Sequence, residues 1–159
     1  MNGVLILAYG NPLRSDDGVG WHACDELRSK FARDGVEIQC LHQLTPEIAE
    51  RVSWADGVIF VDAAESGSPG EVRCTPVTAS SQPARFSHQL SPLEILTLAR
   101  ELYGARPRAY VITLSGERFE HGMDLSNAVA EAMPQLLAEV DRRVREFQTV
   151  EQVSRPLAR

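Results

Sequence analysis

The chain of 159 residues has no apolar run close to the roughly 20 residues that a bilayer-spanning helix needs. Its first apolar run has no basic flank and no small-residue cleavage pattern, so it does not resemble a signal peptide. Only three cysteines are present, widely spaced and without a C-x-x-C pair, as is typical of a reducing compartment. We therefore expect a cytoplasmic protein with no membrane partner.

Positive charge is also scarce. The sequence has 16 Lys and Arg against 22 Asp and Glu, and the net charge of −6 argues against a nucleic-acid partner. The arginines near the C-terminus are mixed with acidic residues, which is typical of a solvated helix face. The motifs G-x-S-x-G, H-E-x-x-H and the Walker loop are absent, so a covalent serine or cysteine mechanism has little support.

Apolar strand patterns alternate with helical patterns along the chain. Strands are predicted at 4–9, 36–41, 57–61, 71–75 and 109–114, with 71–75 at an edge. Helices are predicted to begin near Gly18, Thr45, Ser91 and Leu125, with Pro134 kinking or dividing the last one. This order predicts an α/β fold, a three-layer α/β/α sandwich with a mostly parallel twisted sheet of about five strands. We expect a single domain over residues 1–149 and a polar C-terminal tail, 150–159, that frays.

The stretch Gly10–Gly20 joins the first predicted strand to the first predicted helix. A Gly-rich loop in this position usually indicates a nucleotide-binding turn. Here the adjacent carboxylates of Asp16 and Asp17 stand where a phosphate would bind, and they would repel it. The loop therefore favours a divalent metal ion or a cationic group.

Three further polar residues lie at the same predicted edge of the sheet. His42 follows the second strand, Asp62 follows the third, and His88 stands just before a helix start. Sites in open α/β sheets form beyond the carboxyl ends of the strands, so these side chains can converge with the aspartate pair. Carboxylate and imidazole sets suit Zn, Ni, Mn or Fe, and three protein ligands leave positions open for water or substrate.

Each of these residues also has an ordinary structural interpretation. Asp16 or Asp17 alone could cap the following helix. Asp62 could be a turn residue, and His88 a hydrogen-bonded loop histidine. The metal-site hypothesis stands only if the residues meet in space.

Gly10-Asn11-x-Leu13-x-x-Asp16-Asp17-Gly18-x-Gly20, followed by Val61-Asp62-Ala63 and His88-Gln89-Leu90, resembles the motifs of the hydrogenase maturation endopeptidases. Gly116-Glu117, Gly122 and Leu125-Ser126 are similar to the last loop and helix start of that family. The resemblance implies a nickel-dependent protease with one catalytic domain, which removes a C-terminal peptide from the large-subunit precursor of a NiFe hydrogenase.

The resemblance also implies roles for particular residues. Asp17, Asp62 and His88 match the metal-binding positions, and the nickel would be supplied by the precursor. Asp16, the fourth candidate catalytic residue, would orient the loop or serve as a base. The stretch 42–47, together with Leu102-Tyr103-Gly104, is most similar to the branch that serves NAD-linked bidirectional hydrogenases.

Other functions remain open from the sequence. The same fold could support a metal-dependent hydrolase of a small substrate, or a nickel-sensing chaperone that docks a precursor without cutting it. A nucleotide-binding protein is a third alternative, against which the pair Asp16-Asp17 argues.

Overall fold

The computed structural model describes residues 3–32, 35–84 and 90–154. Its strands are β1 (Val4–Tyr9), β2 (Val36–Leu41), β3 (Gly57–Ala64), β4 (Val72–Val77) and β5 (Arg108–Ser115). They form one sheet in the order β2-β1-β3-β5-β4, in which only β4 runs antiparallel to its neighbour. The predicted mostly parallel sheet with a polar edge strand is confirmed.

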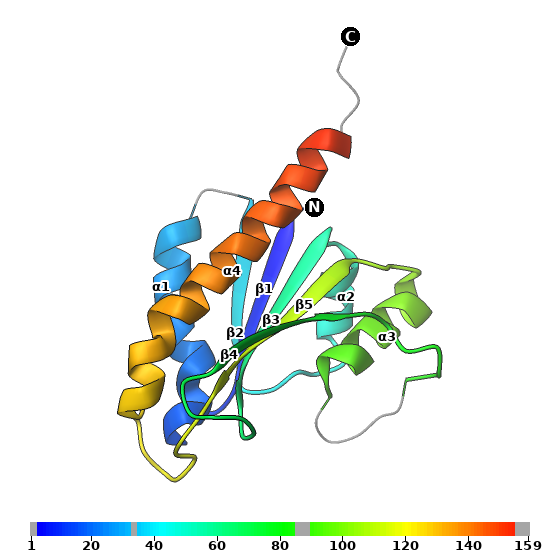
Figure 1. Cartoon of the computed structure of the whole chain (residues 1–159). Coiled ribbons are helices and arrows are strands. Elements are labelled where there is room, and N and C mark those ends of the chain that lie inside the picture. Colours follow the sequence, from blue (N-terminus) through cyan, green and yellow to red (C-terminus); the bar gives the residue numbers. More distant parts are fainter. Residues whose placement is uncertain (1–2, 33–34, 85–89, 155–159) are drawn as a thin grey trace.

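Helices cover both faces of this sheet (Figure 1). One face carries α1 (Val19–Phe31) and α4 (Asn127–Ser154), and the other carries α2 (Ile48–Ser53) and α3 (Pro92–Tyr103). A short 3-10 helix, η1 (Ser15–Gly18), precedes α1. The arrangement is the expected three-layer α/β/α sandwich.

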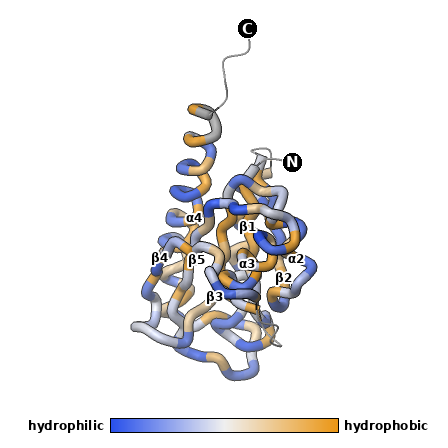
Figure 2. The backbone as a smooth tube through the Cα atoms, turned by 90° about the vertical axis from the view of Figure 1, so that its right-hand side faces the viewer, coloured by the Kyte–Doolittle hydropathy of each residue, from blue (hydrophilic) through white to orange (hydrophobic). Residues whose placement is uncertain are grey.

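Alternation of side chains along the strands divides the core in two. Ile6 of β1 packs with the α1 and α4 layer, whereas its neighbours Leu5 and Leu7 pack with the α2 and α3 layer. The apolar residues accordingly concentrate in the strands and in the helix faces that meet them (Figure 2). Both faces of the central strands are therefore removed from water.

Helix α2 begins later than predicted. The Thr45-Pro46 pair was expected to start the helix, but the carbonyls of these residues accept the N–H groups of Ile48 and Ala49 in three-residue turns. The segment before Ile48 is therefore a tight turn, in which the Thr45 side chain does not cap a helix.

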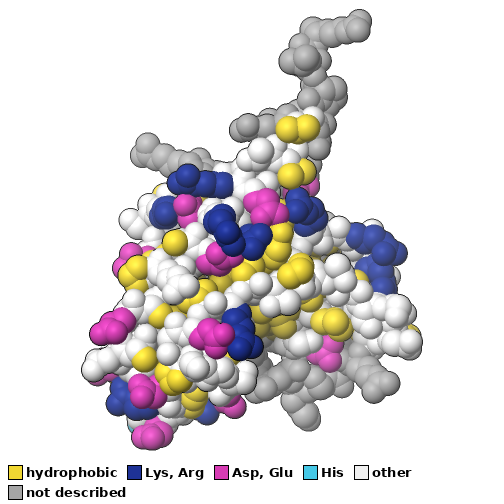
Figure 3. All heavy atoms as spheres, viewed as in Figure 1, with side chains coloured by type: hydrophobic (Ala, Val, Ile, Leu, Met, Phe, Trp, Pro, Cys, Tyr) yellow, Lys and Arg dark blue, Asp and Glu magenta, His cyan; other side chains and the backbone are white. Residues whose placement is uncertain are grey.

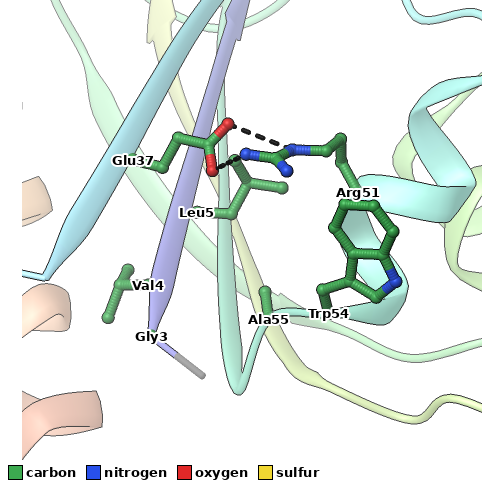
Figure 4. Close-up of a pocket in the computed structure, with 7 residues that line it drawn as sticks. All are labelled: Gly3, Val4, Leu5, Glu37, Arg51, Trp54 and Ala55. Atoms are coloured by element: carbon green, nitrogen blue, oxygen red, sulfur yellow. Dashed lines mark hydrogen bonds and ion pairs between the residues drawn. The ribbon is translucent and has the colours of Figure 1, made fainter. Parts of the chain in front are cut away.

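A pair of charged side chains fastens α2 to the sheet. Arg51 forms a two-bond ion pair with Glu37 of β2, in which its Nε lies 3.1 Å from Oε1 (Figure 4). The same guanidinium lies 5.2 Å from the centroid of the Trp54 ring. The hydrogen bonds from Arg51, with smaller contributions from Gln39 and from the charge of Arg51, hold the pKa of Glu37 below its usual value although burial acts against them.

Helix α3 begins as predicted. The Ser91 hydroxyl accepts the backbone N–H of Glu94, and the Glu94 carboxylate accepts the N–H of Ser91 at 2.8 Å. The helix ends at Gly104, whose φ of 67° is the left-handed conformation that glycine adopts without a Cβ penalty.

Helix α4 runs through Pro134 without dividing. A proline removes one backbone hydrogen bond, but the buried stripe continues on both sides of it through Val129, Leu136 and Val140. The helix continues to Ser154, so the first part of the predicted polar tail is helical, and residues 155–159 lie outside the described residues.

Charges of both signs are interspersed on the exposed side of α4 (Figure 3). Arg143 pairs with Glu139 and Glu146, and Arg145 pairs with Asp141. This pattern is that of a solvated helix face, as the sequence indicated. In the described part of the chain, no helix combines the length and apolarity that a membrane crossing requires.

Candidate active site

Four segments meet at the carboxyl edge of the sheet, the lower edge in Figure 1. They are the loops after β1 and β2, the end of β3 and the start of α3, and they line a cavity of about 440 Å³. Among the residues that the structure describes, the titratable ones that line it are Tyr9, Arg14, Asp17, His42, Asp62 and Glu65. Carboxylates from two separate segments thus share one cavity.

Asp62 is part of β3, and its interpretation as a turn residue is wrong. The strand continues past Val61 because Asp62 to Ala64 pair with Thr113 to Ser115 of β5. The Asp62 carboxylate accepts the N–H of Ala63 at 2.8 Å and a hydrogen bond from the Tyr9 hydroxyl. It is therefore held by two donors at the floor of the cavity.

The surroundings of Asp62 disfavour its charged form. Burial raises the pKa of its carboxyl to about 7, and the negative charges of Asp17 and Glu65 add to this effect. The donors on Ala63 and Tyr9 act in the opposite direction but do not cancel it. Burial and the charge of Asp62 also raise the pKa of the Tyr9 hydroxyl, which therefore stays protonated. A cation in the cavity would relieve the repulsion between these carboxylates.

Asp17 closes the loop after β1. Its Oδ2 accepts the N–H of Asn11 at 2.8 Å. Gly10 has a φ of 142°, and a Cβ there would stand 2.1 Å from the backbone oxygen of Asp17, so only glycine permits this turn. Neither aspartate caps a helix, because the N-cap positions are Arg14 for η1 and Gly18 for α1.

Asp16 is fully buried beneath the segment between β5 and α4. Its Oδ2 accepts the N–H groups of Glu117 and Arg118 at 2.8 and 2.9 Å. The N–H and hydroxyl of Ser126 donate to its two oxygens, both at 2.8 Å. Burial alone would raise the pKa of this carboxyl, but the donated hydrogen bonds prevail and hold it below its usual value. This geometry favours a role in orienting the loop over that of a base.

Backbone hydrogen bonds join the same two segments, and we call this joint between residues 13–16 and 116–126 the loop interlock. Ser15 donates its N–H to the carbonyl of Gly122, and Gly122 donates to Leu13, both at 2.8 Å. Asp16 donates its N–H to Arg118 at 3.0 Å. Ser15 has a φ of 50°, a conformation that a non-glycine residue adopts only when its surroundings impose it. The position of Asp17 therefore depends on residues about a hundred positions further along the chain.

Of the two histidines predicted near this edge, the structure describes only His42. His42 is exposed on the cavity rim, where its ring lies 5.0 Å from the ring of Trp21. His88 lies outside the described residues, whereas Leu90 to Pro92, which follow it, line the cavity. Among the described residues, no group of three or more His, Cys, Asp or Glu is arranged to hold a metal ion.

Asp17 and Asp62 therefore line the same cavity, whereas Asp16 is buried under the segment between β5 and α4. His88 is not among the described residues. Sequence reasoning missed Tyr9 and Glu65. Tyr9 is a polar residue at the end of an apolar strand, and Glu65 lies three positions after Asp62. Their places in the sequence could therefore have indicated that both lie at the site.

These features define an α/β/α protein with a carboxylate-lined cavity at the carboxyl edge of its sheet. A model of the hydrogenase maturation protease family matches residues 40–142, so the chain belongs to this family of enzymes. The matched region includes Asp62 and His88, while Asp16 and Asp17 precede it.

Solved structures from the same group of proteins have this fold. The maturating endopeptidase HybD from Escherichia coli is 24% identical, with a TM-score of 0.70 over 91% of this chain and 93% of that one. HybD from Thermococcus kodakarensis is 21% identical, with a TM-score of 0.69 over 89% and 99%. The maturation protease HycI from the same archaeon is 20% identical, with a TM-score of 0.70 over 90% and 92%. No curated protein sequence matches the chain.

Proposed function

We propose that this enzyme is a nickel-dependent endopeptidase that removes the C-terminal peptide from the large-subunit precursor of a NiFe hydrogenase. Family membership supports a hydrogenase precursor as the substrate class. The observation that supports the nickel dependence is the cavity itself, which Asp17, Asp62 and Glu65 line together and in which burial, aided by the charges of Asp17 and Glu65, raises the pKa of Asp62. Such crowding of carboxylates is the electrostatic setting of a cation site.

In this proposal Asp17, Asp62 and His88 bind the nickel ion that the precursor presents. Two carboxylates and an imidazole are a donor set that suits Ni²⁺. With a pKa of about 7, Asp62 exchanges its proton near neutral pH, so a cation competes with that proton for the carboxylate. With a nickel-free precursor no cation displaces that proton, so Asp62 would remain protonated for part of the time near neutral pH.

When bound, nickel would supply positive charge that could polarise the scissile carbonyl and activate a water molecule. The residues of this chain would orient the two carboxylates that bind the ion. Tyr9 holds the Asp62 carboxylate through its hydroxyl, and Asn11 holds Asp17 through its N–H. Asp16 fixes the loop after β1 by the four hydrogen bonds that it accepts from Glu117, Arg118 and Ser126. No nucleophilic side chain of the enzyme is required.

Within the family, we assign the chain to the branch that serves NAD-linked bidirectional hydrogenases. The support is the stretch that begins at His42, together with Leu102-Tyr103-Gly104. His42, Gln43 and Leu44 line the cavity, so residues typical of the branch stand where a substrate would enter. We expect the reaction to take place in the cytoplasm.

The test compares nickel-loaded and nickel-free precursor of a bidirectional hydrogenase, each incubated with the enzyme and followed by intact mass. We expect only the loaded precursor to lose its C-terminal peptide. Equal cleavage of both forms would refute the nickel dependence, and binding without any shortening would support the chaperone alternative.

A further inference from the structure

Two large apolar side chains are exposed beside the cavity. Leu13 is 47% exposed and Met123 is 71% exposed, and each lies on one of the two loops of the interlock. Leu13 directly precedes Arg14, which lines the cavity, and Met123 directly follows Gly122, whose N–H donates to the carbonyl of Leu13 at 2.8 Å. The two loops lie side by side at the lower edge of the sheet (Figure 1). Both apolar side chains are therefore carried by backbone that adjoins the cavity.

Arg14 is the third member of this surface. Among the described residues that line the cavity, it is the only arginine or lysine, beside the carboxylates of Asp17, Asp62 and Glu65. Its Nε donates to the carbonyl of Phe119 at 3.2 Å, and this bond orients the guanidinium. Within the described part of the chain, no ion pair engages its two Nη groups. These groups are therefore available to an anion from outside the chain.

The loop interlock fixes this surface before any partner arrives. Arg14 and Gly122 form a short parallel bridge, and the Ser15 hydroxyl donates to the carbonyl of Glu120 at 2.9 Å. The four hydrogen bonds to the Asp16 carboxylate hold the same two segments together. A backbone that is already ordered loses little conformational freedom on binding, so more of each contact contributes to affinity.

We propose that Leu13, Arg14 and Met123, which we call the docking rim, bind the large-subunit precursor next to its cleavage site. This inference rests on the proposed function and extends it from the cavity to the surface beside it. The occupant is a precursor segment that carries an apolar side chain and an Asp or Glu. Because an endopeptidase cuts inside a chain, residues next to the scissile bond carry a carboxylate only on such side chains.

The chemistry of the three residues matches this segment. Exposed apolar side chains that gather beside a cleft mark interaction surfaces, and Leu13 and Met123 gain free energy when a partner removes them from water. The polarisable and flexible side chain of Met123 adapts to the shape of its partner. The cavity carboxylates attract a cation but repel any negative group of the same substrate, and Arg14 offsets that repulsion by pairing with the substrate carboxylate. The rim thus contributes binding, while the cavity contributes the chemistry.

The experiment measures kcat and KM for cleavage of nickel-loaded precursor by the full-length enzyme. We expect Leu13→Ser, Met123→Ser and Arg14→Gln each to raise KM about tenfold. The kcat should stay within about twofold, because the rim binds the ground state and the transition state alike. Two matched controls, Val153→Ser on α4 and Arg106→Gln between α3 and β5, replace exposed residues elsewhere and should leave both constants unchanged.

Two further measurements separate a docking role from a structural one. Circular dichroism and thermal unfolding should show that every variant is folded as stably as the unaltered enzyme. High salt should raise KM for the unaltered enzyme but much less for Arg14→Gln, because salt screens an ion pair between exposed charges. The variant Arg14→Lys keeps the charge and should recover part of the lost affinity.

The outcomes distinguish the docking rim from the proposed function. If the unaltered enzyme cleaves the precursor and the rim variants keep its KM, the docking rim is refuted and the proposed function is not. A loss confined to kcat would also overturn the rim. If the unaltered enzyme cleaves no precursor, both proposals are refuted. A dimer that is lost in Leu13→Ser and Met123→Ser, as measured by analytical ultracentrifugation, would assign the surface to a second copy of the chain and overturn the proposal.

Discussion

Replacement of Asp16 by asparagine should make the protein unfold more readily, because it weakens the loop interlock. The asparagine oxygen can keep the N–H groups of Glu117 and Arg118, but its NH2 group then faces the N–H of Ser126, which now donates to the other carboxylate oxygen. Each buried donor left without an acceptor costs about 1–3 kcal/mol, and a bond to a charged group is at the upper end. We therefore expect Asp16→Asn to lower the free energy of unfolding by about 3–5 kcal/mol, a large share of the 5–15 kcal/mol typical of a domain.

Urea unfolding followed by circular dichroism at pH 7 measures this change. The matched control is Asp17→Asn, because that side chain is half-exposed and its remaining oxygen can still accept the N–H of Asn11. We expect the control to change the stability by less than about 1 kcal/mol. A change of less than 1 kcal/mol for Asp16→Asn as well would refute the account of the loop interlock.

The pH dependence gives a second, independent measurement of Asp16. Since the folded protein holds the pKa of this carboxyl below its value in the unfolded chain, the folded state binds fewer protons. Its contribution to stability is therefore complete above about pH 4 and is lost as the pH falls through the folded pKa. The Asp16→Asn variant should lack this component, and an unaltered acid profile would contradict the reasoning.

Three further changes test other parts of the molecule. Asp62→Asn should slow precursor cleavage at least about 100-fold, whereas the matched variant Glu65→Gln, at the cavity rim, should change it less than about tenfold in the same intact-mass assay. Equal losses would remove Asp62 from the proposed nickel site. Ser91→Ala should cost about 1 kcal/mol through loss of the α3 cap, as thermal unfolding can measure, and an unchanged Tm would show that the cap is dispensable. Phe60→Ala should cost about 3–5 kcal/mol in urea, because the ring is fully buried between the sheet and the α2 and α3 layer, and a smaller loss would mean that the core closes around the gap.

The fold was predictable where local pattern decides the structure. The bounds of β1 follow from an apolar run between Gly3 and Gly10, and those of β2 from an alternating pattern after Gly35. The last residues of β3 could not be assigned to the strand from the sequence, because Asp62 is extended through its pairing with Thr113 of β5, about fifty residues away. Thr45-Pro46 has strong helix-start chemistry, and the regular helix begins two residues beyond Pro46, after two local turns that Thr45 and Pro46 open.

In the candidate site, too, some features could be predicted from the sequence and others could not. Asp17 and Asp62 could be placed at one edge of the sheet because parallel strands end together there. The burial of Asp16 could not be predicted, since its donors on Glu117, Arg118 and Ser126 lie 101 to 110 positions away in sequence. Nothing in the Gly10–Gly20 loop itself distinguishes the inward aspartate from the one that faces the cavity.

The loop interlock has a consequence for the order in which this protein is made. Ribosomes synthesise a chain from its N-terminus, so the aspartates at 16 and 17 emerge long before Ser126. Until that serine has left the ribosome, Asp16 lacks two of the hydrogen-bond donors that hold it, and the loop after β1 is not fixed in its final position. A partly synthesised copy of this protease therefore cannot cut, because the residues that hold its first loop are translated 101 to 110 positions after Asp16.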